Sequence, residues 1–321
     1  MAGFRDDPVI QSVLQSLEGD RIAVAAAKRK SFIVMGAGAI IIALTVFLVS
    51  GLIWGYIAGG IVLIYGIVLN FKTAPAFNAY KNNFKLKVIG AALRDIDQSL
   101  LIEPDAGIKE REFIKTRLFD HTPDRYSSED LVSGKADKTS FYFSEVDAEY
   151  KTEHTDNKGR KTETWHTIFK GILFVADFNK KFHGTTIVTA RDLGGTVGSW
   201  IAKAAPIFFS SASKEVELEN VDFNKTFITN STDQIEARYI LTPAMMDRLC
   251  ELNSKCKNTI SLSFIDSRVY IAFPLDENYF EPPLFKSILD PSCLERDIYI
   301  IGFMHGIVKE LDLNTRIWGK E

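Results

Sequence analysis

The stretch GILFVADFNKKFHGTTIV, from Gly171 to Val188, places titratable side chains directly after a run of apolar residues. The titratable residues in this stretch and just beyond it are Asp177, Lys180, Lys181, His183, Arg191 and Asp192. Two carboxylates held together can act as a general acid and a general base. If the flanking apolar runs pair as a hairpin, Asp177, Arg191 and Asp192 come close to one another. An arginine beside carboxylates is more typical of an ion pair that closes a sheet edge, and we favour that interpretation.

The same residues allow two functional hypotheses and a structural one. An enzyme site assembled by tertiary contacts would use Asp177, His183, Arg191 and Asp192. A lipid-headgroup site would use the cations Lys180, Lys181 and His183. The structural interpretation is a six-residue turn between two strands, from Asn179 to Gly184, in which the glycine supplies backbone freedom.

No established catalytic motif accompanies these residues. The chain has no GxSxG elbow, HExxH helix, phosphate-binding P-loop or kinase signature. The Gly-rich segment DLGGTVGSW (Asp192–Trp200) lacks the lysine of a P-loop, and none of the five histidines has a second histidine three or four residues away. We therefore predict no catalytic residue, no cofactor and no metal, and we favour a binding function over catalysis.

The composition argues against some other classes of protein. The net charge is −3 and the pI is about 6.0, so nothing indicates a nucleic-acid binder. The chain has three cysteines, and Cys250 and Cys256 lack the spacing of zinc ligands. A sparse, odd number of cysteines is typical of buried thiols in a reducing compartment.

A segment of 38 residues without a charge, from Phe32 to Leu69, indicates contact with a membrane. One helix of this length would be about 57 Å long, almost twice the thickness of a bilayer core. Two short spans joined near Ser50–Gly51 fit better, so we predict that the lipid bilayer is a partner. The alternative is a buried helical hairpin in a soluble protein, which would normally carry polar residues on its outer faces. The spans contain no ionisable residue, which argues against a channel or transporter.

Positively charged residues flank this segment on both sides. They are Arg21, Lys28, Arg29 and Lys30 before it, and Lys72, Lys81, Lys85 and Lys87 after it. Such flanks stay in the cytoplasm, so both termini are expected there, which requires an even number of spans. Gly51, Gly55 and Gly59 recur every four residues and permit close helix packing. We favour packing between the two spans, with packing against a second copy in a homo-oligomer as the alternative.

These patterns divide the chain into four regions. Residues 1–31 are expected to be cytoplasmic and to contain an amphipathic helix that begins at Asp7–Pro8. Residues 32–70 form the transmembrane hairpin, residues 71–105 a juxtamembrane helix, and residues 106–321 a cytoplasmic α+β domain.

Within residues 106–321 the patterns predict a mostly antiparallel sheet. In SFYFSEVDAEY the apolar residues shift from odd to even positions, which predicts a bulge near Ser144–Glu145. In TWHTIFKGILFVADF the residues that would face either side of a strand are apolar, as in a central strand covered on both faces. Further strands are expected in TTIVTARD, SKEVELENVDF and QIEARYIL, and a hairpin is expected at Asp266–Ser267. Helices are expected in TPAMMDRLCELN and from Leu294 to Leu311. Strands grouped before and between helices indicate an α+β fold, preceded here by the transmembrane hairpin.

Four separate phrases resemble a known family. They are DRYSSEDLVSGK…TSFYFSEVDAEY (Asp124–Tyr150), FKGILFVADFNKKFHGTTIV (Phe169–Val188), RYILTPAMMDRL (Arg238–Leu249) and ELDLNTRIW (Glu310–Trp318). Together they are similar to a bacterial family of two-span membrane proteins of unknown function, domain-of-unknown-function family 3137. The resemblance implies the bacterial inner (cytoplasmic) membrane and implies no catalytic residues.

Taken together, we expect an integral membrane protein that presents a cytoplasmic binding or scaffold domain to a protein partner or to a second copy of itself. The alternatives are a membrane-tethered enzyme and a lipid-headgroup-binding module.

Overall fold

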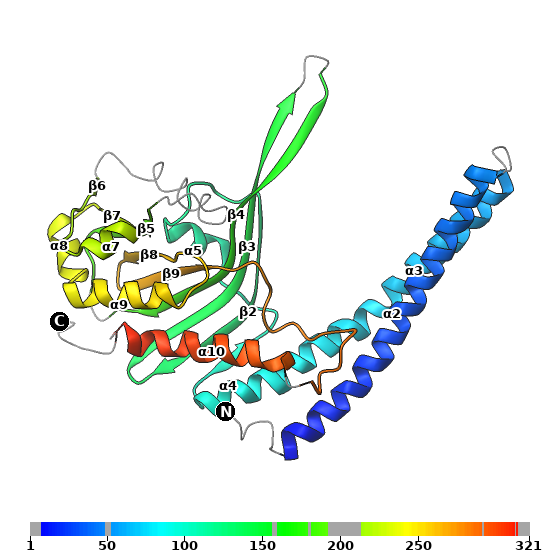
Figure 1. The fold of residues 1–321 in the computed structure, drawn as a ribbon, viewed down its shortest axis with the longest axis horizontal. Coiled ribbons are helices and arrows are strands. Elements are labelled where there is room, and N and C mark those ends of the chain that lie inside the picture. The colour runs from blue at the N-terminus through cyan, green and yellow to red at the C-terminus, as the bar shows by residue number, and fades with distance from the viewer. Residues whose placement is uncertain are drawn as a thin grey trace. The chain divides into compact units, whose positions relative to one another are not determined.

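A computed structural model describes residues 8–48, 53–155, 159–178, 181–191, 213–290, 292–311 and 313. The chain divides into two compact units. The first contains Met1–Asp95 and Phe280–Asp297, and the second contains Ile96–Tyr279 and Ile298–Glu321. Figure 1 shows the order of the elements along the chain.

The first unit is built on two long helices, α2 (Pro8–Leu48) and α3 (Ile53–Phe84). Both are long and apolar enough to cross a membrane, with mean hydropathies of 2.5 and 1.8 in their most apolar windows. The expected N-terminal amphipathic helix and the first apolar stretch form one continuous helix. After α3 the helix continues through a π-helical turn, η1 (Lys85–Ile89), into α4 (Gly90–Ile96).

A segment from the second half of the sequence, the 280–290 strap (residues 280–290), packs onto these helices within the first unit. The guanidinium of Arg21 donates a hydrogen bond to the carbonyl oxygen of Leu284 at 2.8 Å, and the Glu18 carboxylate accepts one from the amide of Ile288 at 3.1 Å. The side chain of Lys85, which is buried, forms an ion pair with Glu281 at 2.8 Å. The strap is thus held on α2 and on η1 by polar contacts.

The described strands of the second unit form one antiparallel sheet of nine strands, in the order β1-β2-β3-β4-β9-β8-β5-β7-β6. The strands are β1 (Leu101–Glu103), β2 (Arg125–Ala136), β3 (Thr139–Thr155), β4 (Lys161–Asp177), β5 (Thr185–Ala190), β6 (Lys214–Glu215), β7 (Phe227–Ser231), β8 (Ser261–Ile265) and β9 (Arg268–Pro274). The α+β fold with an antiparallel sheet is therefore confirmed, as are the hairpin at Asp266–Ser267 and the central position of β4.

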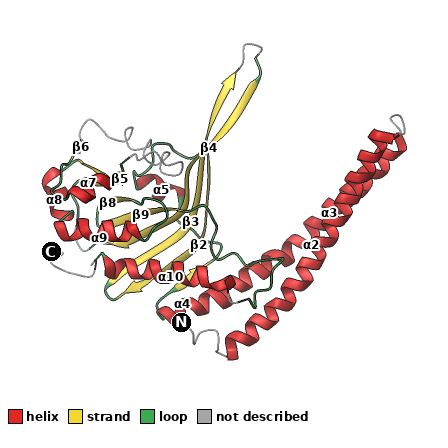
Figure 2. Cartoon of the chain, viewed as in Figure 1, coloured by secondary structure: helices red, strands yellow, loops and turns green. Residues whose placement is uncertain are grey.

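Helices cover both faces of this sheet (Figure 2). On one face, Phe113 of α5 (Glu110–Lys115) joins Phe119, Phe169 and Tyr270 in a hydrophobic core. On the other face, Phe303 of α10 (Ser292–Glu310) packs edge-on against Phe273, with the ring centroids 5.8 Å apart. Because β4 is covered on both sides, its residues from Ile172 to Ala176 are all buried, which explains their continuous apolar run.

The predicted bulge exists at the expected register, but the extra residue lies in the partner strand. Glu129 pairs with Glu145 and Val132 with Phe143, so β2 has one more residue than β3 over this interval. Asp130 in the bulge has a positive φ of 59°. β3 keeps its register with β4 over this interval. Its burial pattern changes phase because Phe141 and Phe143 are buried against Phe174 on one face of the sheet, whereas Val146 and Ala148 belong to the core on the other face.

Two predicted strands are wrong. QIEARYIL forms the helix α8 (Gln234–Ile240), because the Asp233 carboxylate accepts hydrogen bonds from the amides of Ile235 and Glu236 and caps the helix. SKEVELENVDF contains only the two-residue strand β6 and the start of helix α7 (Val221–Thr226), which Asn220 caps. The predicted helix in TPAMMDRLCELN is α9 (Pro243–Ser254), and Thr242 caps it as expected.

Candidate functional site

The residues of the predicted polar cluster are separated by the fold. Lys180 and Asp192 lie outside the described residues, so the structure places only Asp177, Lys181, His183 and Arg191. The strands β4 and β5 do not pair as a hairpin, because β9 and β8 lie between them. β4 and β5 are therefore separated by three inter-strand distances of about 4.8 Å each. Asp177 and Arg191 also lie at opposite ends of their strands. Asp177 is level with the first residue of β5, whereas Arg191 follows the last residue of β5.

The segment after β4 explains this arrangement. The amide of Phe178 donates a hydrogen bond to the carbonyl oxygen of Ser267 at 2.7 Å, and the amide of Phe182 bonds the carbonyl oxygen of Asp266. The chain thus passes over the turn of the β8–β9 hairpin on its way to β5. A local turn and a crossing over an inserted hairpin need the same polar residues, so their composition does not distinguish them.

Two described members of the predicted cluster, Arg191 and His183, take part in structural contacts. Arg191 forms an ion pair with Glu215 of the edge strand β6 at 3.7 Å and bonds the carbonyl oxygen of Asn224 at 2.7 Å. The buried Glu236 carboxylate accepts hydrogen bonds from the amides of His183 and Gly184, at 3.1 and 2.8 Å. The arginine thus has an ion pair at the sheet edge, but its partner is a glutamate of β6.

Gly184 serves a different purpose from the one its position in a turn suggests. Its φ is not among the positive values of the described glycines, so backbone freedom is not the reason for glycine here. A Cβ atom at this position would lie 2.9 Å from the Thr232 hydroxyl and 3.0 Å from the Asp233 Cβ. The missing side chain lets the start of α8 approach, which brings Glu236 to the two amides.

Gly55 and Gly59 of α3 lie in the contact between α2 and α3. A Cβ at Gly55 would collide with Thr45, and one at Gly59 would lie 2.6 Å from the side chain of Ile42. Gly51 lies outside the described residues. The two described glycines therefore allow close packing within the hairpin.

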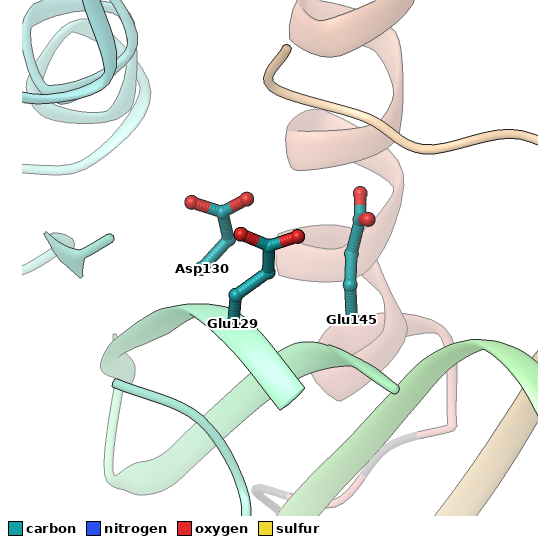
Figure 3. Close-up of side chains that lie close together, drawn as sticks. All are labelled: Glu129, Asp130 and Glu145. Atoms are coloured by element: carbon teal, nitrogen blue, oxygen red, sulfur yellow. The ribbon is translucent and has the colours of Figure 1, made fainter. Parts of the chain in front are cut away.

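Sequence reasoning missed a group of three carboxylates on β2 and β3: Glu129, Asp130 and Glu145. Their carboxylate oxygens lie within 4.8 Å of one another. In Figure 3 the three side chains rise from neighbouring strands toward the same space. Adjacent residues of a strand normally point to opposite faces, but the bulge and the positive φ of Asp130 bring its side chain beside that of Glu129.

Glu129 and Glu145 line a groove of about 430 Å³ that also has Asp147, Lys170 and Asn278 in its wall. Burial raises the pKa of Asp147, while Lys170, at 3.9 Å, opposes that shift. Carboxylates grouped in this way could hold a hard cation such as Ca²⁺ or Mg²⁺. One oxygen of Glu145 also accepts a hydrogen bond from the amide of Tyr279. The sequence signal was the phase slip at Ser144, which located the bulge but not the acidic group.

A second hollow, the α10 pocket, is apolar and has an open volume of about 580 Å³. Its walls come from α10, from the end of β9 and from the turn that follows α9. The lining residues are Lys255, Cys256, Lys257, Asn258, Phe273, Pro274, Leu275, Tyr279, Tyr299, Ile300, Phe303 and Met304. A mostly apolar lining with a few polar groups is typical of small-molecule binding sites.

Comparisons with known proteins give a family match over part of the chain. A crystal structure of the mycobacterial trehalose monomycolate transport factor A, TtfA, is similar over 70% of this chain and 96% of its own, at 7% identity and a TM-score of 0.36. A likeness this weak supports no conclusion about the fold or function of this chain. No curated protein matches the chain. Residues 167–313 match the family described as "Protein of unknown function (DUF3137)". The resemblance seen in the sequence is thereby confirmed over these residues.

Proposed function

We propose that the protein is anchored in a membrane by the α2–α3 hairpin and presents its second unit in the cytoplasm as a non-enzymatic binding or scaffold domain. The observation that carries the anchor is the outward-facing apolar surface of the hairpin. Phe47 is 87% exposed and Trp54 is 75% exposed, although both helices pack against each other. Apolar surface of this extent is stable in lipid, whereas in water it would drive aggregation.

The charges at the base of the hairpin support a cytoplasmic location of both flanks. The ammonium group of Lys28, which precedes the first span, donates a hydrogen bond to the side chain of Asn70 at 2.7 Å. Asn70 follows the second span, so the two flanks meet at one end of the hairpin. Because both flanks are rich in lysine and arginine, this end belongs on the cytoplasmic side. The family resemblance favours the bacterial inner membrane.

The outer part of the β3–β4 hairpin is the surface that we propose for partner binding, and we call its described residues, 151–155 and 161–166, the arm. Within the part of the chain that the structure describes, these residues pair only with each other, because β2 begins opposite Glu149 and β9 ends opposite Gly171. Figure 1 shows the arm extending from the sheet. Its free strand edges can accept an added strand from a partner.

Site-specific photocrosslinking in intact membranes tests this proposal. A photoreactive residue at Thr164, on the arm, is expected to give a discrete adduct that disappears when Glu163 is replaced by proline, because the Glu163 amide points to the outer edge of the strand and proline removes that donor. A photoreactive residue at the exposed Lys225 of α7 is the matched control and is expected to give none. Equal adducts at both positions, or an arm adduct that Glu163→Pro leaves unchanged, would contradict the binding role.

A further inference from the structure

We propose that the α10 pocket binds the alkyl chain of a membrane amphiphile and leaves its polar head in water. This inference deepens the proposed function, since the membrane anchor would keep the pocket close to a supply of such molecules. It rests on the shape of the pocket, on the residues of its wall and on the pairing of the charges at its mouth.

The pocket is a hollow lined by buried side chains and is not a flat apolar patch on the surface. Phe273 and Ile300 are 3% and 6% exposed, and Met304 is fully buried. Of the large apolar side chains in the lining, Tyr299 is the one that is largely exposed, and its ring stacks on that of Phe303 with the centroids 6.2 Å apart. A protein partner needs an interface of roughly 1,000 Å² or more, whereas a narrow hole with buried walls suits a single slender group.

The polar side chains at the mouth are already paired with other groups. Lys255 pairs with Glu310 at 2.7 Å, Lys257 pairs with Asp276 at 2.9 Å, and Asn258 donates to the carbonyl oxygen of Pro274 at 3.0 Å. The thiol of Cys256 donates to the carbonyl oxygen of Leu252 at 3.3 Å. An occupant therefore gains little from placing a polar or charged group inside, and its affinity must come from burial of apolar surface.

An alkyl chain fits these conditions better than a rigid aromatic group. The flexible side chain of Met304 and the edges of several rings form a wall that adapts to a flexible occupant. The ion pairs at the mouth form a polar rim on which a hydrated headgroup can rest. Amphiphiles with a single chain, such as palmitate, have this combination of an apolar chain and a polar end.

Cys256 provides a reporter inside the pocket, and Cys250 provides a control outside its lining. The experiment uses the full chain in nanodiscs of two-chain phospholipids, because detergents are single-chain amphiphiles like the proposed occupant. Alkylation of each cysteine by N-ethylmaleimide is followed by peptide mass spectrometry, with and without palmitate. Burial raises the pKa of the Cys256 thiol to about 12, so its alkylation is slow and easily followed.

Palmitate at ten times its dissociation constant leaves about a tenth of the sites free, so Cys256 should be alkylated about tenfold more slowly. Cys250 should react at an unchanged rate. Ile300→Trp, which fills the pocket, should abolish the effect of palmitate. Ile235→Trp, on the exposed face of α8, should preserve that effect.

An unchanged rate at Cys256 in the presence of palmitate would overturn the inference, and so would equal protection by 1-naphthoate, which has no alkyl chain. If Ile300→Trp fails to fold, the two ligands on the unaltered chain still decide the question. Palmitate is added directly, so a positive result would stand even if the chain proved not to span a membrane. A negative result would leave the arm and the anchor intact.

Discussion

At the scale of single residues, Gly171 has the most constrained backbone position in the sheet. Its φ is +148°, and an added Cβ would collide with the carbonyl oxygen of Phe273 and lie 2.8 Å from the amide nitrogen of Leu275. Gly171→Ala is therefore expected to lower the free energy of unfolding by about 3 kcal/mol, from strain and overpacking. Gly159 is the control, since its φ is +74° but an added Cβ meets nothing within 4 Å. Chemical denaturation of both variants checks this, and equal losses would refute the steric argument.

Asp297 gives a prediction about pH. Its carboxyl is buried in the first unit, and burial raises its pKa from 3.8 to about 6, although the amide of Phe280 at 3.1 Å and the cations Arg296 and Lys85 oppose the shift. Glu281 reinforces the effect of burial. Between about pH 4 and pH 6 the folded state binds more protons here than the unfolded state does. The contribution of Asp297 to the free energy of unfolding therefore falls as the pH rises through this window.

Asp297→Asn should remove this pH dependence. Relative to the unaltered chain, the variant should gain stability as the pH rises from about 4 to 6, by up to about 3 kcal/mol, and the difference should stay constant above that. Asp222→Asn, at an exposed position on α7, is the control and should show no such trend. The measurement is urea denaturation at a series of pH values. If the free energies of unfolding of Asp297→Asn and of the unaltered chain changed with pH in parallel, the raised pKa of Asp297 would be contradicted.

At the scale of elements, two adjacent glycines of α3 distinguish the face that packs on α2 from the face that we expect to contact lipid. A Cβ at Gly59 meets Ile42 and the backbone of α2, whereas a Cβ at Gly60 meets nothing within 4 Å. Gly59→Leu is expected to destabilise the hairpin by about 2 kcal/mol through overpacking, and Gly60→Leu to change its stability little. Thermal unfolding in nanodiscs compares the two. A larger effect at Gly60 would place the helix contact on another face.

The elements that were predicted correctly are marked by sequence signals of only a few neighbouring residues. Thr242–Pro243 marks the start of α9, and Asp266–Ser267 marks a hairpin, because caps and tight turns depend on a few neighbouring residues. The strand predicted at Gln234–Leu241 failed because Ile235, Ala237 and Tyr239 alternate as they would in a strand. The cap at Asp233, with Glu236 three residues later, was the stronger signal.

The features that could not be predicted depend on residues far apart in the chain. The insertion of the β8–β9 hairpin between β4 and β5 joins segments about 80 residues apart, and it adds to the separation of Asp177 and Arg191, which also lie at opposite ends of their strands. The α10 pocket combines a turn after α9, the end of β9 and one helix face. The acidic group requires both a bulge and the correct register of β2 on β3. No local pattern contains this information, because each site is defined by tertiary contacts.

At the scale of the whole molecule, the chain combines an apolar helical hairpin with a domain that has its own core. The DUF3137 match covers residues 167–313, which lie after the hairpin. The family match and the membrane anchor therefore rest on different parts of the chain. The anchor is the central claim, since the supply of amphiphiles to the α10 pocket and the access of the arm to partners both depend on it.

Cysteine labelling in intact cells tests this claim most directly. A membrane-impermeant maleimide is expected to label Gly51→Cys in intact cells, and to label Gln11→Cys and the native Cys250 only after lysis. Alkaline carbonate should leave the chain in the membrane fraction. This result would establish an anchored hairpin with both flanks in the cytoplasm. Labelling of Gly51→Cys only after lysis, together with release of the chain by carbonate, would contradict the anchor.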